Sequence, residues 1–424
     1  MLKFFLPNFE DLVDPEYDFE LDKQSPSHKN RRTHDRYAHE FFPSPIFDGM
    51  LVSKASLSFS AQRDVVASGG IRQFTRLHPD LPIMGDCGAF TYLLEEKPIY
   101  TVPDVLKYYQ DFGFNYGVSL DHLAFVTIEM LEAALTQGKI KQRWWQNKTT
   151  EQIRMERFEL TLKNAQEFLD LSTKQKLSFI PVGIAQGGTP ELYADAVRRL
   201  INMGYGYIAI GGLVRSSDKD IIAILKEIQP LIKHGVQLHI FGVARLSLIP
   251  DFVKLGVTSA DSASPLRRAF LGTGEDNYWA MDGSKYAAIR VPEANTKRIK
   301  RGLDHPGDVV ANGDRPVDSI EALTKMEQNV LNLLRFYDQG KSKLDETLEA
   351  LLNYDRLFGD GREYDVWYRR TLENLPWKKC NCPICKKIGI EVMIFRGNNR
   401  NRRRGFHNVK VFYDQLHNLL QKLS

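Results

Sequence analysis

Polar side chains follow several apolar segments of this chain, at points where strands would end. Asp86, Asp121 and Asp261 supply carboxylates, Gln186 supplies an amide, and the glycines at 211–212 expose backbone. A purine edge is recognised by such a set, because a carboxylate accepts from its N–H groups while an amide and backbone N–H groups bind its carbonyl. Two carboxylates also suit a glycosidic bond, where one attacks the anomeric carbon and the other moves protons. Taken singly, each residue also fits a helix cap or a turn.

A cysteine cluster near the end of the chain predicts a metal site. Cys380, Cys382 and Cys385 lie within six residues, and His407 follows after 21 more. Three thiolates and an imidazole form a closed tetrahedral zinc set, which leaves no position for water and therefore indicates structural Zn2+. His417 is an alternative fourth ligand.

Charge is spread unevenly along the 424 residues, whose net charge is only +4. Nine Lys/Arg and one acid, Glu391, lie between Lys378 and Arg404, and five Lys/Arg lie between Lys23 and Arg36. Such clusters can neutralise phosphates, although a charge run also fits a solvated face. We expect nucleic-acid contacts from arginines in the first cluster and from two beside Asp261. They are Arg396, Arg400, Arg402, Arg403, Arg404, Arg267 and Arg268.

Short apolar runs alternate with helical patterns over about 270 residues, which predicts a parallel α/β sheet. Eight strands with crossover helices favour a closed TIM (β/α)8 barrel, and an open doubly wound sheet is the alternative. The expected strands are 2–7, 50–56, 82–90, 116–121, 179–186, 207–213, 237–244 and 257–263.

We expect two domains. Residues 1–315 would form the catalytic barrel, with a basic N-terminal insertion at about 18–45, and 316–424 a helical, zinc-binding subdomain packed on it. Residues 272–315 are irregular, and helices are expected near 317–338, 342–357 and 408–423. No run of 18 apolar residues predicts a membrane span, and the N-terminus lacks a signal-peptide pattern, so a cytoplasmic protein is expected.

Five segments together resemble the tRNA-guanine transglycosylase superfamily. Residues 86–90 (DCGAF) are similar to its Asp-Ser-Gly-Gly-Phe/Tyr segment, 183–188 (GIAQGG) to Gly-Ile-Val-Gln-Gly-Gly, and 209–213 (AIGGL) to Ala-Val-Gly-Gly-Leu. Residues 241–243 (FGV) resemble Met-Gly-Val, and the Cys-x-Cys-x2-Cys cluster with His407 resembles the family's zinc signature.

The resemblance implies roles for individual residues. Asp261 corresponds to the position of the family's covalent nucleophile, and Asp86 to that of its general acid/base. Phe90 corresponds to the aromatic residue that stacks on the base. The positions that bind the purine are Cys87, Asp121, Gln186, Gly212 and Leu213. The implied reaction is ping-pong: guanine leaves, and a 7-deazaguanine then displaces the enzyme from C1′.

Departures from the tRNA enzymes change the expected acceptor. The sequence ADSASPLR at 260–267 replaces Phe-Asp-Cys-Val-Leu-Pro-Thr-Arg, and the N-terminal region is unlike theirs. It looks like the DpdA branch, the DNA 7-deazaguanine transglycosylases, which implies DNA as acceptor and preQ0 (7-cyano-7-deazaguanine) as the incoming base. The resemblance also implies a homodimer and leaves open partner proteins of a DNA-modification system.

Three other interpretations stay open. One is an enzyme of the same chemistry that acts on tRNA, and another is a non-catalytic nucleic-acid-binding subunit on the same fold. The third is an unrelated barrel hydrolase with a structural zinc. A duplex acceptor would require the guanine to be flipped out, and Trp144 and Trp145 either stack on an unpaired base or pack in a core.

Overall fold

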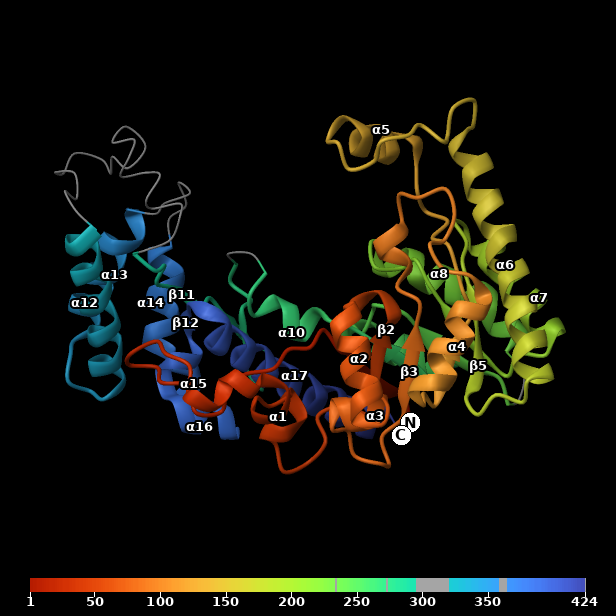
Figure 1. Ribbon diagram of the computed structural model, residues 1–424. Coiled ribbons are helices and arrows are strands. Elements are labelled where there is room, and N and C mark those ends of the chain that lie inside the picture. Colours follow the sequence, from red (N-terminus) through yellow and green to blue (C-terminus); the bar gives the residue numbers. More distant parts are fainter. Residues whose placement is uncertain (233–234, 272–273, 295–319, 358–363, 424) are drawn as a thin grey trace. The chain divides into compact units, whose positions relative to one another are not determined.

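The chain folds into two compact units, which are described separately. The computed structural model describes residues 1–232, 235–271, 274–294, 320–357 and 364–423 (Figure 1). The barrel unit comprises Met1–Phe9, Phe47–Ala263 and Leu416–Ser424. The tail unit comprises Glu10–Ile46 and Ser264–Gln415.

Eight parallel strands close into a barrel in chain order, with β1 pairing β8, so the predicted TIM barrel is confirmed and the open sheet is not. Every expected strand overlaps an observed one. The strands are β1 (Lys3–Pro7), β2 (Gly49–Ser53), β3 (Ile83–Asp86), β4 (Tyr116–Val118), β5 (Ile180–Ala185), β6 (Tyr207–Ile210), β7 (Gln237–Ile240) and β8 (Ser259–Asp261).

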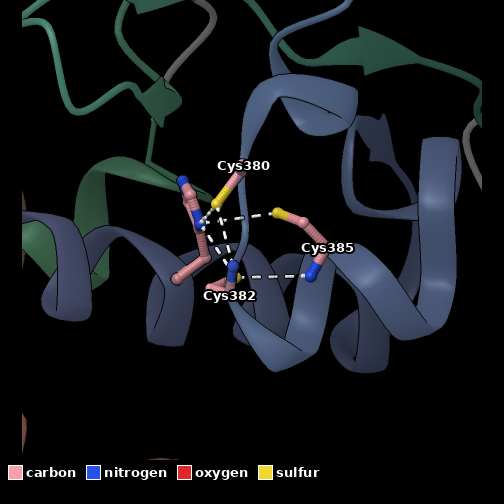
Figure 2. A group of neighbouring side chains, drawn as sticks. Cys380, Cys382 and Cys385 are labelled. Atoms are coloured by element: carbon pink, nitrogen blue, oxygen red, sulfur yellow. Dashed lines mark hydrogen bonds between the residues drawn. The ribbon is translucent and has the colours of Figure 1, made fainter.

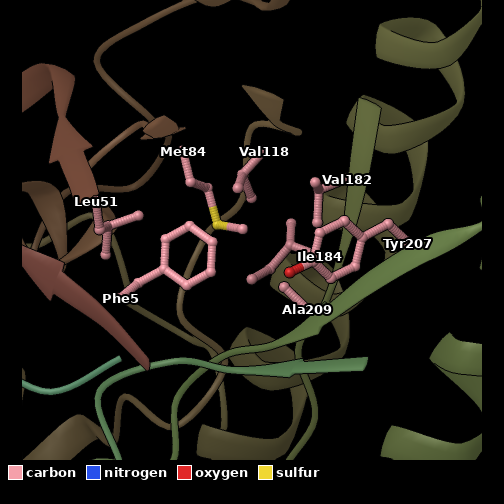
Figure 3. Packing of buried hydrophobic residues seen from close by; sticks show 8 residues of the cluster. All are labelled: Phe5, Leu51, Met84, Val118, Val182, Ile184, Tyr207 and Ala209. Carbon is pink, nitrogen blue, oxygen red and sulfur yellow. The ribbon is translucent and has the colours of Figure 1, made fainter. Parts of the chain in front are cut away.

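Side chains that point into the barrel form its core (Figure 3). Neighbouring strands contribute Phe5, Leu51, Met84 and Val118, all nearly or fully buried. Because alternate residues of a strand point to the same face, β5 gives Val182 and Ile184 and β6 gives Tyr207 and Ala209. Burying one such large apolar side chain contributes roughly 1.5–3 kcal/mol, so this core fixes the strand ends that carry the site.

Helices connect the barrel strands. The N-cap Thr189 and the left-handed Gly204 bound α7 as their sequence pattern predicts, and α7 runs beside α6 (Figure 1). The barrel-unit helices are α2 (Phe59–Ser68), α3 (Ile71–Thr75), α4 (Val102–Phe112), α5 (Ile128–Thr136), α6 (Thr150–Lys174), α7 (Pro190–Met203), α8 (Asp218–Ile228) and α9 (Ile249–Lys254).

Several predicted strands are longer than the observed ones at their carboxyl ends. The third was expected over 82–90, but β3 ends at Asp86 and a 3-10 helix follows at Ala89–Tyr92. The sixth was expected to reach residue 213, but β6 ends at Ile210. The extra residues form turns, and these turns carry most of the candidate site.

The tail unit is mostly helical. Its last helix begins at Gly397, eleven residues before the expected start at 408, because the arginine-rich stretch there is helical. Its helices are α1 (Arg31–His34), α10 (Ser264–Arg268), α12 (Ile320–Asp338), α13 (Leu344–Arg356), α14 (Asp365–Asn374), α15 (Pro376–Lys379), α16 (Pro383–Ile388) and α17 (Gly397–Leu423, grouped with this unit up to Gln415). Its short strands are β9 (Tyr278–Trp279), β10 (Lys285–Tyr286), β11 (Ile289–Arg290) and β12 (Ile394–Phe395).

The two units divide the chain differently from the expected domains. The boundary expected at 315/316 lies outside the described residues, and the irregular 272–315 region includes the short strands β9, β10 and β11. The segment Glu10–Ile46, which contains the whole predicted barrel insertion, groups with the tail unit. Within the described residues, no helix is both long and apolar enough to cross a membrane.

Candidate active site and metal centre

Asp261 lies at the carboxyl end of β8 and is almost fully buried. Its Oδ1 accepts the backbone N–H of Gly242 at 2.8 Å and lies 3.2 Å from Nε2 of His239. Among the described residues, we find no hydrogen bond to Oδ2. One carboxylate oxygen of Asp261 is therefore held by two groups, and within the described part of the chain the other is not.

His239 belongs to a buried chain of hydrogen bonds that ends on Asp261. Tyr207 Oη lies 2.6 Å from Ser259 Oγ, which lies 2.8 Å from Nδ1 of His239. Burial raises the pKa of Tyr207 well above its usual value, so its hydroxyl stays protonated. If Tyr207 donates to Ser259 and Ser259 to Nδ1, the remaining proton of a neutral imidazole lies on Nε2, facing Asp261.

Asp86 lies at the end of β3 and is electrostatically coupled to Asp261. Burial raises the pKa of Asp86, and the negative charge of Asp261 raises it further. Hydrogen bonds from the Gly88 N–H and the Ser53 side chain oppose that rise. The two causes that raise the pKa of Asp86 favour its protonated form, which is the form that can donate a proton.

Asp121 and Gln186 form a buried polar pair beyond the ends of β4 and β5. Gln186 Nε2 donates to Asp121 Oδ2 at 2.6 Å, and the Cys87 thiol donates to Asp121 Oδ1 at 3.1 Å. Burial, followed by the charge of Asp86, raises the pKa of Asp121 to about 7. Gln186 Oε1 is buried and has no hydrogen-bond partner among the residues that the structure describes. An unpaired buried acceptor is costly, so this oxygen favours a ligand with an N–H group.

The turn after β6 brings backbone against this pair. A Cβ atom on Gly212 would lie 2.9 Å from Gln186 Oε1, and its φ of +79° is in the left-handed region. Only glycine therefore fits there without displacing the amide. The next residue, Leu213, is fully buried.

Phe90 is the predicted stacking aromatic, and 51% of its surface is exposed. Its ring centroid lies 6.1 Å from that of Phe125, in the loop after β4. Phe125 also approaches the β6 turn, since a Cβ on Gly212 would lie 3.5 Å from its ring. The barrel thus brings aromatic surface, the polar groups that were predicted to bind the purine, and two carboxylates to the ends of its strands.

His239, Ser259 and the backbone of Gly242 belong to the site but were not predicted from the sequence. His239 and Ser259 are opposite each other in the register between β7 and β8. One sequence feature could have predicted them: a histidine lies in an otherwise apolar strand, next to the strand that ends in Asp261.

The tryptophans favour core packing over base stacking. Trp145 is buried in a small cluster with Leu131 and Ile153, and its Nε1 donates to Glu132. Trp144 is partly exposed, but its Nε1 donates to the Leu94 carbonyl at 3.0 Å.

Most of the arginines assigned to nucleic acid are buried inside the tail unit, and this corrects their assignment. Arg396 pairs with Asp22 and Glu327, and Arg400 pairs with Asp22 and Glu391. Only 8% of Arg396 and 1% of Arg400 is exposed. Guanidinium groups held in this way cannot reach a phosphate.

The next three arginines bind the same unit's backbone. Arg403 and Arg404 are buried, and they donate to the carbonyls of Asp14 and of Ala269 respectively. Arg402 donates to the Leu12 carbonyl and pairs with Asp11 at 3.1 Å. The basic stretch of α17 therefore anchors the segment Glu10–Ile46, and a buried charge requires such partners.

Arg267 and Arg268 differ from this group, because both are exposed. Arg268 lies 3.5 Å from Asp276. Their assignment to nucleic acid stays a prediction.

Cys380, Cys382, Cys385 and His407 come together in the tail unit (Figure 2). The three sulfurs lie 3.6, 3.4 and 3.5 Å from Nδ1 of His407, and all ligand atoms lie within 4.8 Å of one another. A tetrahedral zinc bound at ~2.3 Å by sulfur and ~2.1 Å by nitrogen separates those atoms by about 3.6 Å. The cluster therefore fits a metal ion of that size.

Neighbouring groups orient the metal ligands. Nε2 of His407 lies 2.8 Å from the Trp279 carbonyl, so this nitrogen carries the proton and Nδ1 is free to bind metal. The ring of Tyr278 stacks on the imidazole at 4.1 Å. His417, the alternative fourth ligand, belongs to the barrel unit and not to the tail unit. Its Nε2 lies 3.8 Å from Asp48.

The closed parallel barrel, its strand-end carboxylates and a separate group of four potential metal ligands are features of a TIM-barrel enzyme. Comparison with known proteins narrows the class. A DNA-guanine transglycosylase of Salmonella montevideo is 39% identical over 432 aligned positions, covering 98% of this chain and 96% of that protein. The chain belongs to the tRNA-guanine transglycosylase superfamily, in its DpdA branch, and is a guanine transglycosylase, which is a pentosyltransferase.

More limited matches agree with the family. The family model described as queuine tRNA-ribosyltransferase matches residues 141–295, a range that includes Gln186, Gly212 and Asp261. The queuine tRNA-ribosyltransferase of Gluconacetobacter diazotrophicus is 35% identical over 94 residues, or 22% of this chain and 24% of that protein. That of Haemophilus ducreyi is 25% identical over 175 residues, or 39% and 44%.

Proposed function

We propose that the chain exchanges guanine in DNA for a 7-deazaguanine such as preQ0, through a covalent bond between Asp261 and the sugar. The arrangement at Asp261 carries this proposal: Oδ1 accepts the Gly242 N–H and faces His239 Nε2, while we find no hydrogen bond to Oδ2 among the described residues. The acceptor is proposed from the relative named a DNA-guanine transglycosylase, with which this chain aligns over 98% of its length.

The first half-reaction starts with the guanine in the pocket of Asp121, Gln186 and Gly212. Oδ2 of Asp261 attacks C1′, the C1′–N9 bond breaks, and its electron pair stays on the purine. Asp86 is suited to give this purine a proton, since burial and the charge of Asp261 both favour its protonated form. Neutral guanine then leaves.

The second half-reaction reverses these roles. The incoming 7-deazaguanine enters the same pocket, and the Asp86 carboxylate takes the proton from its N9. N9 attacks C1′, the C1′–Oδ2 bond breaks, and Asp261 is released as a carboxylate. The donors at Oδ1 stabilise the leaving carboxylate.

We also propose that the Cys380, Cys382, Cys385 and His407 cluster binds structural Zn2+. Four protein ligands leave no open position, so the ion would stabilise the tail unit and take no part in base exchange. Reduced thiolates suit the cytoplasm, which is the proposed location.

The test is incorporation of radiolabelled preQ0 by the purified protein into plasmid DNA and, separately, into bulk tRNA, with an Asp261→Ala variant beside it. Label in DNA that the variant fails to incorporate supports both the acceptor and the nucleophile. Label in tRNA alone would replace the proposed acceptor with the one named for the queuine enzymes. Equal label from Asp261→Ala would rule out the covalent route.

A further inference from the structure

Two aromatic rings and one guanidinium form a row beside the turn of the barrel unit that carries Gly212. Phe90 and Phe125 lie 6.1 Å apart, and the guanidinium of Arg215 lies 5.9 Å from the centre of the Phe125 ring. Phe125 is half-buried, whereas Arg215 is exposed. The guanidinium therefore lies within the ~6 Å range of a cation–π contact with the Phe125 ring.

The turn after β6 brings Arg215 close to Gln186 and to the residue that binds Asp261. At its start, Gly212 approaches Gln186 Oε1. Two residues later, a Cβ on Gly242 would lie 2.6 Å from Val214 Cγ2, so Val214 touches the residue whose N–H binds Asp261. Arg215 follows directly and is the first charged side chain of this turn.

Arg215 also differs from the other arginines in loops that follow barrel strands. Arg143 pairs with Glu132 at 2.6 Å, and Arg245 pairs with Asp218. Within the described residues, we find no carboxylate paired with Arg215. An exposed guanidinium that rests on an aromatic ring can form two hydrogen bonds to a phosphate without losing an internal ion pair.

We propose that Arg215 binds a phosphodiester oxygen of the nucleic-acid strand beside the guanosine in the pocket, with Phe125 as its platform. The inference rests on the proposed function and adds a backbone contact to it. A nucleotide whose base lies against Gln186 and whose C1′ faces Asp261 must place its phosphates along the rim that includes this turn. DNA and tRNA share this phosphodiester chemistry.

The experiment compares Arg215→Ala and Arg215→Lys with Arg198→Ala, which removes an exposed arginine from α7 that pairs with Asp195. Binding of a fluorescent single-stranded DNA and of a tRNA anticodon arm is measured over a salt series, and binding of free preQ0 is measured separately. We expect Arg215→Ala to weaken nucleic-acid binding about tenfold and to reduce the salt slope by about one. Arg215→Lys should keep the slope, and binding of preQ0 should not change.

An unchanged salt slope in Arg215→Ala on both nucleic acids would overturn the inference, and so would an equal loss in Arg198→Ala. A loss of preQ0 binding that matches the loss of nucleic-acid binding would also overturn it, because it would indicate a damaged pocket. The exchange assay on the unchanged protein is run in parallel. If that assay fails while the Arg215 slope changes as expected, the proposed function falls and the phosphate contact stands.

Discussion

Nε2 of His239 lies 3.2 Å from Oδ1 of Asp261, and both side chains are buried at adjoining strands of the barrel. The imidazole is itself held by Ser259 at 2.8 Å, so its orientation is fixed before substrate arrives. His239 is therefore a positioning residue for the proposed nucleophile.

Replacing His239 with Phe should slow base exchange about 10- to 100-fold, since a hydrogen bond to a charged group contributes about 1.5–3 kcal/mol. Single-turnover transfer of the sugar to Asp261 is the measurement. Tyr207→Phe, at the far end of the same chain of hydrogen bonds, should slow this transfer only a few-fold. A His239→Phe rate within twofold of the original, in a folded protein, would contradict the role.

The affinity for a free 7-deazaguanine should rise as pH increases through about 7. The pKa of Asp121 is raised to about 7, so its carboxylate form, which accepts N–H groups of the purine, is populated above that pH and lost below it. Titration calorimetry between about pH 5.5 and 8.5 measures this. Asp121→Asn should bind more weakly and without the pH dependence, and a pH-dependent Asp121→Asn would assign the titration to another group.

Cys382→Ser should lower the bound metal below one ion per chain and should destabilise the tail unit. The free energy of metal binding contributes to the free energy of folding, so losing one of four ligands destabilises the fold. A loss of about 3 kcal/mol would lower the melting temperature by roughly 6–12 °C. Native mass spectrometry and calorimetry check the two effects. Cys87→Ser, which changes the buried cysteine outside the cluster, should leave the metal content unchanged.

Arg400→Ala should cost about 3 kcal/mol of stability, because it takes one buried partner from Asp22 and one from Glu391, which keep Arg396 and Arg335 respectively. Arg268→Ala is the matched control: its ion pair is exposed and contributes about 0–1 kcal/mol. Urea denaturation of both variants measures the difference. Equal, small losses would mean that α17 does not anchor the N-terminal segment through these pairs.

The barrel could be predicted because its signal is local. Each strand is a short apolar run between turn residues. Because the carboxyl ends of the parallel strands of a barrel lie at the same end, Asp86, Asp121 and Asp261 could be placed together from the sequence alone. The four potential metal ligands could also be predicted from the sequence, since three of them lie within six residues.

The arginines of α17 could not be understood in the same way. A run of charges normally lies on a solvated face, and the partners that bury these side chains are distant in sequence. Arg396 and Asp22 are separated by 374 residues, and Arg400 and Asp22 by 378. No local pattern links them, and the same burial explains why α17 begins earlier than its apolar spacing predicts.

The end of α17 has a consequence for synthesis of the protein. The turn from Leu416 groups with the barrel unit, where Leu416 and Leu420 are buried and His417 lies 3.8 Å from Asp48. Asp48 in turn accepts the backbone N–H of Phe4 in β1 at 2.8 Å. During synthesis, the start of the first strand therefore acquires all these neighbours only after the segment from Leu416 has left the ribosome. A chain that stops before Leu416 would leave a barrel with an exposed apolar patch, which proteases and chaperones recognise.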